Sequence, residues 1–107
     1  MPNVIQLQAN LPWLYTVDLG SNRWVAVCPP LKLTIEAEDP QDFLETIKEA
    51  IDGFFKELLS TGDLDRFLDE HGWQRLTPIP DRRRGLHFDV PLSTQRVQER
   101  DLQQAVY

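Results

Sequence analysis

The chain has 107 residues, 41% of them hydrophobic and 26% charged, a length and composition that suit one folded domain and exclude a long disordered chain. Seventeen acidic residues against 11 basic ones give a formal net charge of −6. This balance disfavours nucleic acid as a partner, because phosphate contacts need concentrated lysine and arginine. It suits a basic protein partner instead.

The cellular location is indicated by what the sequence lacks. The single cysteine, Cys28, cannot form an internal disulfide, which fits a reducing compartment. Residues 1–11 lack the basic start and apolar run of a secretory signal. No apolar stretch approaches the ~20 residues of a membrane span. We therefore expect a cytoplasmic protein that has no membrane partner.

Three strands are predicted in the first third of the chain, after residues 1–11, which suit either a short strand or an arm. Alternating apolar residues predict a strand over 13–19, and the turn-forming Gly-Ser-Asn run at 20–22 joins it to a second strand over 23–28. Two prolines end that strand, because neither can donate to a ladder. Residues 32–38 alternate most clearly, as in an antiparallel sheet covered on one face.

A long helix follows the third strand. Asp39 is a good N-cap, and Pro40 suits the first helical position. Apolar residues then recur at helical spacing: Phe43, Leu44, Ile47, Ile51, Phe54, Phe55 and Leu58. Gly53 lies inside this stripe, where we expect it to allow close approach to the sheet, and Gly62 is the expected stop.

Smaller elements are predicted in residues 63–107. Asp63 is the expected cap of a short second helix that ends at Gly72. A further strand is predicted over 86–90, after a loop with Arg82, Arg83 and Arg84 at its tip. These arginines could grip phosphate or pair with acidic residues of the same chain. We expect a domain over 1–91 and a polar, helical tail over 92–107.

The predicted fold class is α+β. A small, mainly antiparallel sheet in β-β-β-α-β order carries one long helix on one face, with a short second helix and the C-terminal tail. The core is expected to join the helix stripe to Leu33, Ile35 and the region of Trp24. We also expect a homodimer, because exposed strand edges and apolar tail residues need cover.

The sequence displays no catalytic constellation. Cys28 lies at a strand end beside two prolines, which indicates a packed thiol rather than a nucleophile. His71 and His87 do not share metal-ligand spacing with other ligands, so we expect no metal or cofactor. An acidic cluster is interrupted by apolar residues at helical spacing, which indicates a solvated helix face rather than a calcium loop. Its members are Asp63, Asp65, Asp69 and Glu70.

Three segments resemble the HicB antitoxin domain, a partial ribonuclease-H-like fold. Arg23-Trp24-Val25-Ala26-Val27-Cys28-Pro29 is similar to its second strand, Asp39-Pro40-Gln41-Asp42 to its helix start, and Phe67-Leu68-Asp69-Glu70-His71-Gly72-Trp73 to its short second helix with a glycine stop. The apolar helix positions also match, at Ile47, Ala50, Ile51, Leu58 and Leu59. Residues 30–33 and 36–38 lack the glycines usual in the family, and Asp42-Phe43 replaces its common Glu-Ala pair.

The resemblance implies a non-enzymatic protein-binding domain that blocks a small basic RNA-cleaving toxin by occlusion. The acidic residues expected to bind this partner are Glu36, Glu38, Asp63 and Asp65. We do not expect operator binding, because a ribbon-helix-helix module needs one more helix than residues 86–107 supply.

Two other hypotheses about function are compatible with the sequence. The chain could be a stand-alone member of the same fold, acting as an oligomeric scaffold or small-ligand binder without a toxin. It could also be a metal-dependent nuclease that uses Asp18, Glu49 and Asp89. The acidic balance disfavours the nuclease, because such a surface repels its substrate.

Overall fold

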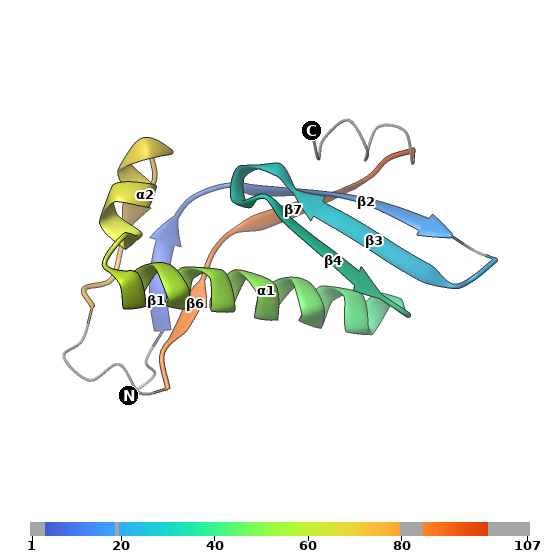
Figure 1. Ribbon diagram of the computed structural model, residues 1–107, viewed down its shortest axis with the longest axis horizontal. Coiled ribbons are helices and arrows are strands. Elements are labelled where there is room, and N and C mark those ends of the chain that lie inside the picture. The colour runs from blue at the N-terminus through green and yellow to red at the C-terminus, as the bar shows by residue number, and fades with distance from the viewer. Residues whose placement is uncertain (1–3, 19, 80–84, 99–107) are drawn as a thin grey trace. The chain divides into compact units, whose positions relative to one another are not determined.

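A computed structural model describes residues 4–18, 20–79 and 85–98, and shows two helices and two mixed, mostly antiparallel sheets (Figure 1). The predicted α+β class with one long helix is confirmed. The chain divides into two compact units. The four-stranded unit comprises residues 11–50 and 92–107, and the three-stranded unit comprises residues 1–10 and 51–91. Arg82, Arg83 and Arg84 lie outside the described residues.

The sheet of the four-stranded unit has the order β4-β3-β2-β7. Its strands are β2 (Leu11–Asp18), β3 (Arg23–Cys28), β4 (Leu33–Ala37) and β7 (Leu92–Arg96), with a 3-10 helix, η1 (Pro29–Leu31), before β4. The antiparallel pairs β2–β3 and β3–β4 confirm the predicted hairpin and third strand. Asn22 has a φ of 53°, a left-handed conformation that asparagine tolerates in the tight turn between β2 and β3.

β7 corrects the expectation of a helical tail. Residues 92–96 form a strand parallel to β2, in register from Leu11↔Leu92 to Tyr15↔Arg96. This polar segment has no apolar period to mark it as a strand, so its conformation depends on the ladder that β2 offers rather than on local preference. The rest of the expected tail, 99–107, lies outside the described residues.

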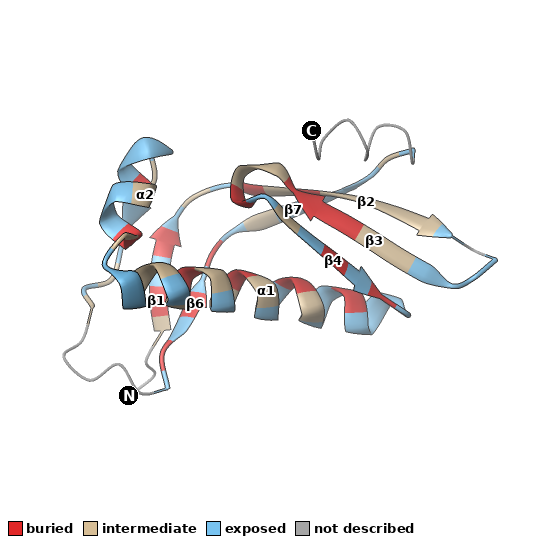
Figure 2. Cartoon of the chain, in the orientation of Figure 1, coloured by how far each residue is buried: buried red, intermediate tan, exposed pale blue. Residues whose placement is uncertain are grey.

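The helix α1 (Pro40–Thr61) begins as predicted. The Asp39 carboxylate accepts a hydrogen bond from the Asp42 N–H at 2.7 Å, which satisfies a donor left free at the helix start. In the four-stranded unit, the Phe43 ring lies 5.2 Å from the rings of both Tyr15 and Trp24. The buried residues of α1 lie along one side of the helix (Figure 2).

Gly53 corrects a second expectation. It is exposed, and a Cβ atom at this position would meet nothing within 4 Å. The close approach to a sheet that we predicted for Gly53 is therefore wrong. The apolar residues on both sides of Gly53 in the sequence misled the prediction, because the glycine itself falls on the solvent side of α1.

The three-stranded unit has a sheet of its own, in the order β5-β1-β6. Its strands are β1 (Val4–Gln8), β5 (Gln74–Arg75) and β6 (His87–Asp89). The predicted strand over 86–90 forms as β6, and it pairs in parallel with β1. The expectation of a single sheet is thus wrong, because residues 9–10 interrupt an otherwise nearly continuous extended run and leave β1 and β2 in different sheets.

Aromatic packing holds the second part of α1 in the three-stranded unit. The Phe55 side chain is fully buried, and its ring lies 5.4 to 6.2 Å from three other rings: those of Phe54, Phe67 and Phe88. The short helix α2 (Leu64–Glu70) follows. Gly72 has a φ of 71°, and the backbone turns there so that the Trp73 N–H donates to the Leu68 carbonyl at 2.8 Å. The predicted glycine stop is confirmed.

Candidate functional site

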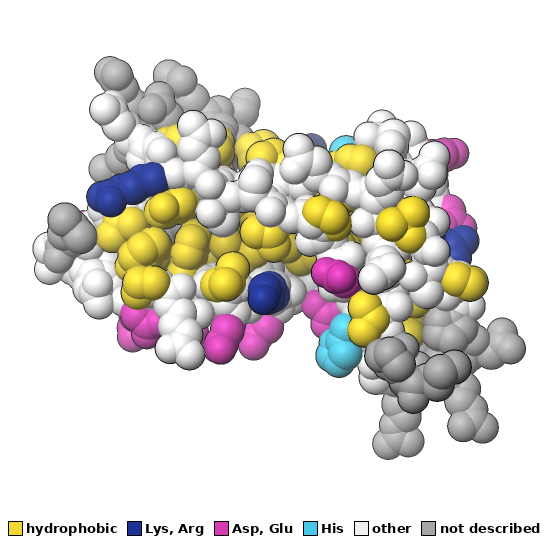
Figure 3. Space-filling view, turned by 180° about the vertical axis from the view of Figure 1, so that it is seen from behind, with side chains coloured by type: hydrophobic (Ala, Val, Ile, Leu, Met, Phe, Trp, Pro, Cys, Tyr) yellow, Lys and Arg dark blue, Asp and Glu magenta, His cyan; other side chains and the backbone are white. Residues whose placement is uncertain are grey.

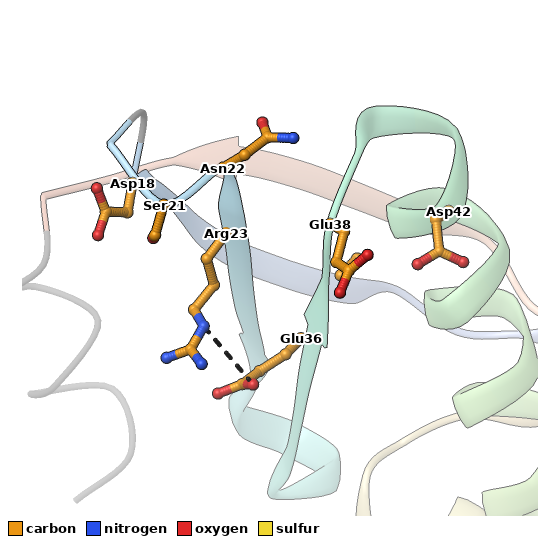
Figure 4. Close-up of a pocket in the computed structure, with 8 residues that line it drawn as sticks. Asp18, Ser21, Asn22, Arg23, Glu36, Glu38 and Asp42 are labelled. Atoms are coloured by element: carbon orange, nitrogen blue, oxygen red, sulfur yellow. Dashed lines mark ion pairs between the residues drawn. The ribbon is translucent and has the colours of Figure 1, made fainter.

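An acidic groove lies at one end of the four-stranded sheet (Figure 4). It has a volume of about 690 Å³ and is lined by Asp18, Ser21, Asn22, Arg23, Glu36, Ala37, Glu38 and Asp42. The β2–β3 turn, the end of β4 and the first turn of α1 supply these residues. Four carboxylates and one guanidinium give the groove a formal charge of −3.

Asp18 is held in its position by the turn that follows it. The Gly20 N–H donates to the Asp18 carboxylate at 3.0 Å. Hydrogen bonds from the Ser21 hydroxyl and from the backbone N–H groups of Gly20 and Ser21 lower the pKa of this carboxyl. Asp18 is therefore ionised at neutral pH, and it keeps a fixed negative charge at the mouth of the groove.

Arg23 neutralises the groove only weakly. Its Nε atom lies 3.9 Å from the Glu36 carboxylate, and both side chains are 60% exposed. Exposed pairs of this kind contribute little, about 0–1 kcal/mol. Both groups can therefore exchange this contact for one with a partner, and Glu38 and Asp42 add charge on the side of α1 (Figure 4).

The four residues that we expected to bind a partner belong to two different units. Glu36 and Glu38 share the groove, whereas Asp63 and Asp65 belong to the three-stranded unit. Asp63 accepts hydrogen bonds from Thr61 at 2.9 Å and Arg66 at 2.8 Å.

The carboxylates of Asp63 and Asp65 are thus engaged within their own unit. Asp65 accepts from Arg75 at 3.1 Å. Asp63 is the N-cap residue of α2, as expected, but it makes no side-chain capping hydrogen bond.

Sequence reasoning missed Asp18, Arg23 and Asp42 as companions of Glu36 and Glu38. The hairpin register places Asp18 opposite Arg23, and the short link from β4 to α1 brings the first helical turn beside the end of β4. The signal was present in the turn-forming run at 20–22 and in the helix start at Asp39. Only the pairing of three strands, however, shows that these charges line one groove.

Partly exposed apolar side chains also occur in the four-stranded unit, and Figure 3 shows apolar side chains in yellow and acidic side chains in magenta on one face of the molecule. Tyr15 and Trp24 are half-buried and their rings stack at 5.6 Å. Val17 is paired with Trp24, and both lie with Tyr15 on the face of the sheet opposite Arg23 and Glu36. Leu44 on α1 is 45% exposed. The four-stranded unit thus offers apolar contact area as well as negative charge.

The other candidate residues have structural surroundings. Cys28 is fully buried, as expected, and burial raises the pKa of its thiol to about 11, which keeps it protonated at neutral pH. His71 ends α2, where its Nδ1 lies 2.9 Å from the Phe67 carbonyl. His87 is exposed on β6, and its Nδ1 lies 3.3 Å from the Asp52 carboxylate.

The carboxylates considered for a nuclease belong to two different units. Asp18 and Glu49 belong to the four-stranded unit, and Asp89 belongs to the three-stranded unit. Across residues 4–18, 20–79 and 85–98, no set of three or more His, Cys, Asp or Glu side chains is placed to hold a metal ion.

The chain matches no family model, and it shows no significant similarity to a curated protein or to a solved structure. Among the described residues, neither helix combines the length and apolar character that a membrane span requires.

Proposed function

We propose that this protein is a non-enzymatic, cytoplasmic protein-binding domain similar to a HicB-type antitoxin. It would bind a small basic RNA-cleaving toxin and block it by occlusion. The observation that carries this proposal is the acidic groove, which four carboxylates and one weakly engaged arginine line together. Clefts lined by one sign of charge raise the association rate of an oppositely charged partner.

The apolar side chains of the same unit support a protein partner rather than a small ion. Charge at the rim of an interface mainly sets the association rate, whereas buried aromatic anchors supply most of the affinity. The rings of Tyr15 and Trp24 pack on Phe43, on the sheet face opposite Arg23 and Glu36. Leu44 on α1, which is 45% exposed, is the suitable anchor. A partner that combines basic and apolar side chains would therefore fit this unit.

The test begins with capture of the tagged protein's partners from its native cells. The wild type should retain a small basic protein at about 50 mM salt and release it at about 300 mM, because salt screens contacts between exposed charges. The captured protein should cleave RNA when it is free and should be inactive in the complex. Recovery of the chain alone at both salt concentrations would contradict the proposal.

Two variants with the same net charge then locate the binding surface. The first carries Glu36→Gln with Glu38→Gln, and the second carries Asp63→Asn with Asp65→Asn. We expect the first to weaken the purified complex about tenfold, mainly through a slower association rate. We expect the second to have a smaller effect, because Asp63 and Asp65 do not line the groove. Equal affinities for the wild type and the first variant would refute the role of the groove.

The alternative of a stand-alone oligomeric domain also has an observation in its favour, because β7 ends the four-stranded sheet among the described strands.

A further inference from the structure

β7 has an open outer edge in the described part of the chain, where it pairs with β2 on one side only. The Val97 N–H donates to the Tyr15 carbonyl at 2.8 Å. In a parallel strand, the N–H and C=O of one residue point to the same side, and successive residues alternate between the two sides. Ser93, Gln95 and Val97 therefore direct their backbone groups to β2. By the same alternation, the backbone groups of Leu92, Thr94 and Arg96 point outward.

The other outer strands of the two sheets are protected from pairing with another chain. Proteins protect such edges with charged side chains and with short strands. β5 has two residues and β6 has three. β4 bears Glu36, with Lys32 and Glu38 at its two ends. β7 has five residues and carries no charge before Arg96, so it is the least protected edge among the described strands.

We infer that β7 binds β7 of a second copy of this chain in an antiparallel pair, with a two-fold axis at Thr94. The outward-pointing residues 92, 94 and 96 are symmetric about Thr94. Thr94 therefore faces the second copy's Thr94, and Leu92 faces the second copy's Arg96. In this register each facing pair exchanges both of its backbone hydrogen bonds. The two four-stranded sheets become one continuous sheet across the interface.

The side chains agree with this register. Facing threonines are a favourable cross-strand pair, and like charges that face each other are unfavourable. Arg96 meets a leucine rather than the second copy's Arg96, so no like-charge pair forms. The strand residues 92–96 are exposed or half-buried in the single chain. Pairing therefore needs no rearrangement of the described strands of this sheet.

The charge of the chain predicts how salt affects this dimer. Each copy carries a formal charge of −6, so two copies repel each other, and salt screens that repulsion. The dimer should therefore become tighter as salt rises, whereas a complex with a basic toxin should become weaker. A pair of single strands buries little surface, and we expect a dissociation constant of about 10 µM. The inference stands independently of the acidic groove and of the proposed toxin.

The experiment is sedimentation equilibrium of the purified full chain. Thr94→Lys should weaken the dimer about fivefold or more, because two like charges then face each other at the axis. Gln95→Lys is the matched control, since it adds the same charge one residue away, where the second copy offers Ser93. We expect it to stay within about twofold of the wild type. Equal weakening by both substitutions, or a wild-type monomer at about 100 µM, would overturn the inference.

Disulfide trapping tests the register in the same protein. Facing residues of a hydrogen-bonded antiparallel pair have Cα atoms about 5.5 Å apart, within the reach of a disulfide. Thr94→Cys should therefore give a covalent dimer under mild oxidation. Ser93→Cys should not, because the two Ser93 positions are offset by two residues along the strands. The native Cys28 is buried and does not compete. Faster trapping through position 93 than through position 94 would refute this register.

Discussion

Removing the Asp52 carboxylate should destabilise the three-stranded unit. Asp52 on α1 is 20% exposed, and one of its oxygens accepts the Phe88 N–H of β6 at 2.8 Å. Its other oxygen lies 2.7 Å from the Lys56 ammonium and 3.3 Å from His87 Nδ1. This carboxylate therefore joins α1 to β6, and it satisfies a part-buried backbone donor that has to find an acceptor.

The size of the effect follows from these contacts. A hydrogen bond to a charged group is worth about 1.5–3 kcal/mol, and an exposed i,i+4 pair such as Asp52–Lys56 adds about 0.3–0.5 kcal/mol. We therefore expect Asp52→Ala to lower the free energy of unfolding by about 2–3 kcal/mol. Asp52→Asn keeps an acceptor oxygen for the Phe88 N–H, so its cost should be nearer 1 kcal/mol.

Urea unfolding measures this difference, with Glu49→Ala as the control because Glu49 is exposed on the same helix. The control should change the free energy of unfolding by less than about 0.5 kcal/mol. A loss for Asp52→Ala no larger than that of Glu49→Ala, at an unchanged m-value, would refute the reasoning.

The pH dependence provides a second check. Burial raises the pKa of Asp52, but the bonds from Lys56, Phe88 and His87 outweigh burial, and the pKa of Asp52 is lowered on balance. A carboxyl whose folded pKa is depressed contributes stability above its unfolded pKa of about 3.9 and loses it as pH falls through the folded value. The difference in stability between the wild type and Asp52→Asn should therefore shrink below about pH 4. A difference that stays constant from pH 7 to about pH 3 would contradict this.

Three further predictions concern single residues. Gly53→Ala should raise the free energy of unfolding by about 0.5–1 kcal/mol, because Gly53 is exposed in a helix with open space around it. Gly62→Ala should instead lower the free energy of unfolding, because Gly62 has a φ of 79°, which alanine adopts only with strain. Thermal melts of both variants check these directions. A lower melting temperature for Gly53→Ala, or a higher one for Gly62→Ala, would contradict them. Cys28 should react with an aromatic disulfide reagent at pH 8 at least ~100-fold more slowly in the native protein than in urea, because its thiol is buried and its pKa is about 11. Equal rates with and without urea would show that the thiol is accessible.

The sequence predicted the individual helices and strands better than their arrangement. The alternation in β4, the helix start at Asp39 and the stop at Gly72 each depend on the physical preferences of a few neighbouring residues. The same reasoning identified Glu36 and Glu38 as exposed acids on one strand. It could not show that Asp18 and Asp42 join them, because that depends on how the hairpin, β4 and α1 pack.

The errors have a common physical cause. The helical prediction for residues 92–96 failed because a polar segment has weak preferences, and pairing with β2 outweighs them. The single predicted sheet failed because no local signal distinguishes a strand that pairs with its neighbour from one that pairs with a distant segment, as β1 does with β6.

By itself, then, the sequence determined the α+β class, the long helix, most of the strands and the acidic character of the surface. The tertiary structure alone decided that the strands form two sheets, that four carboxylates share one groove, and that β7 lies at the edge of a sheet. The reason is that local propensities act over a few residues, whereas strand partners and shared surfaces depend on contacts between residues far apart in the chain.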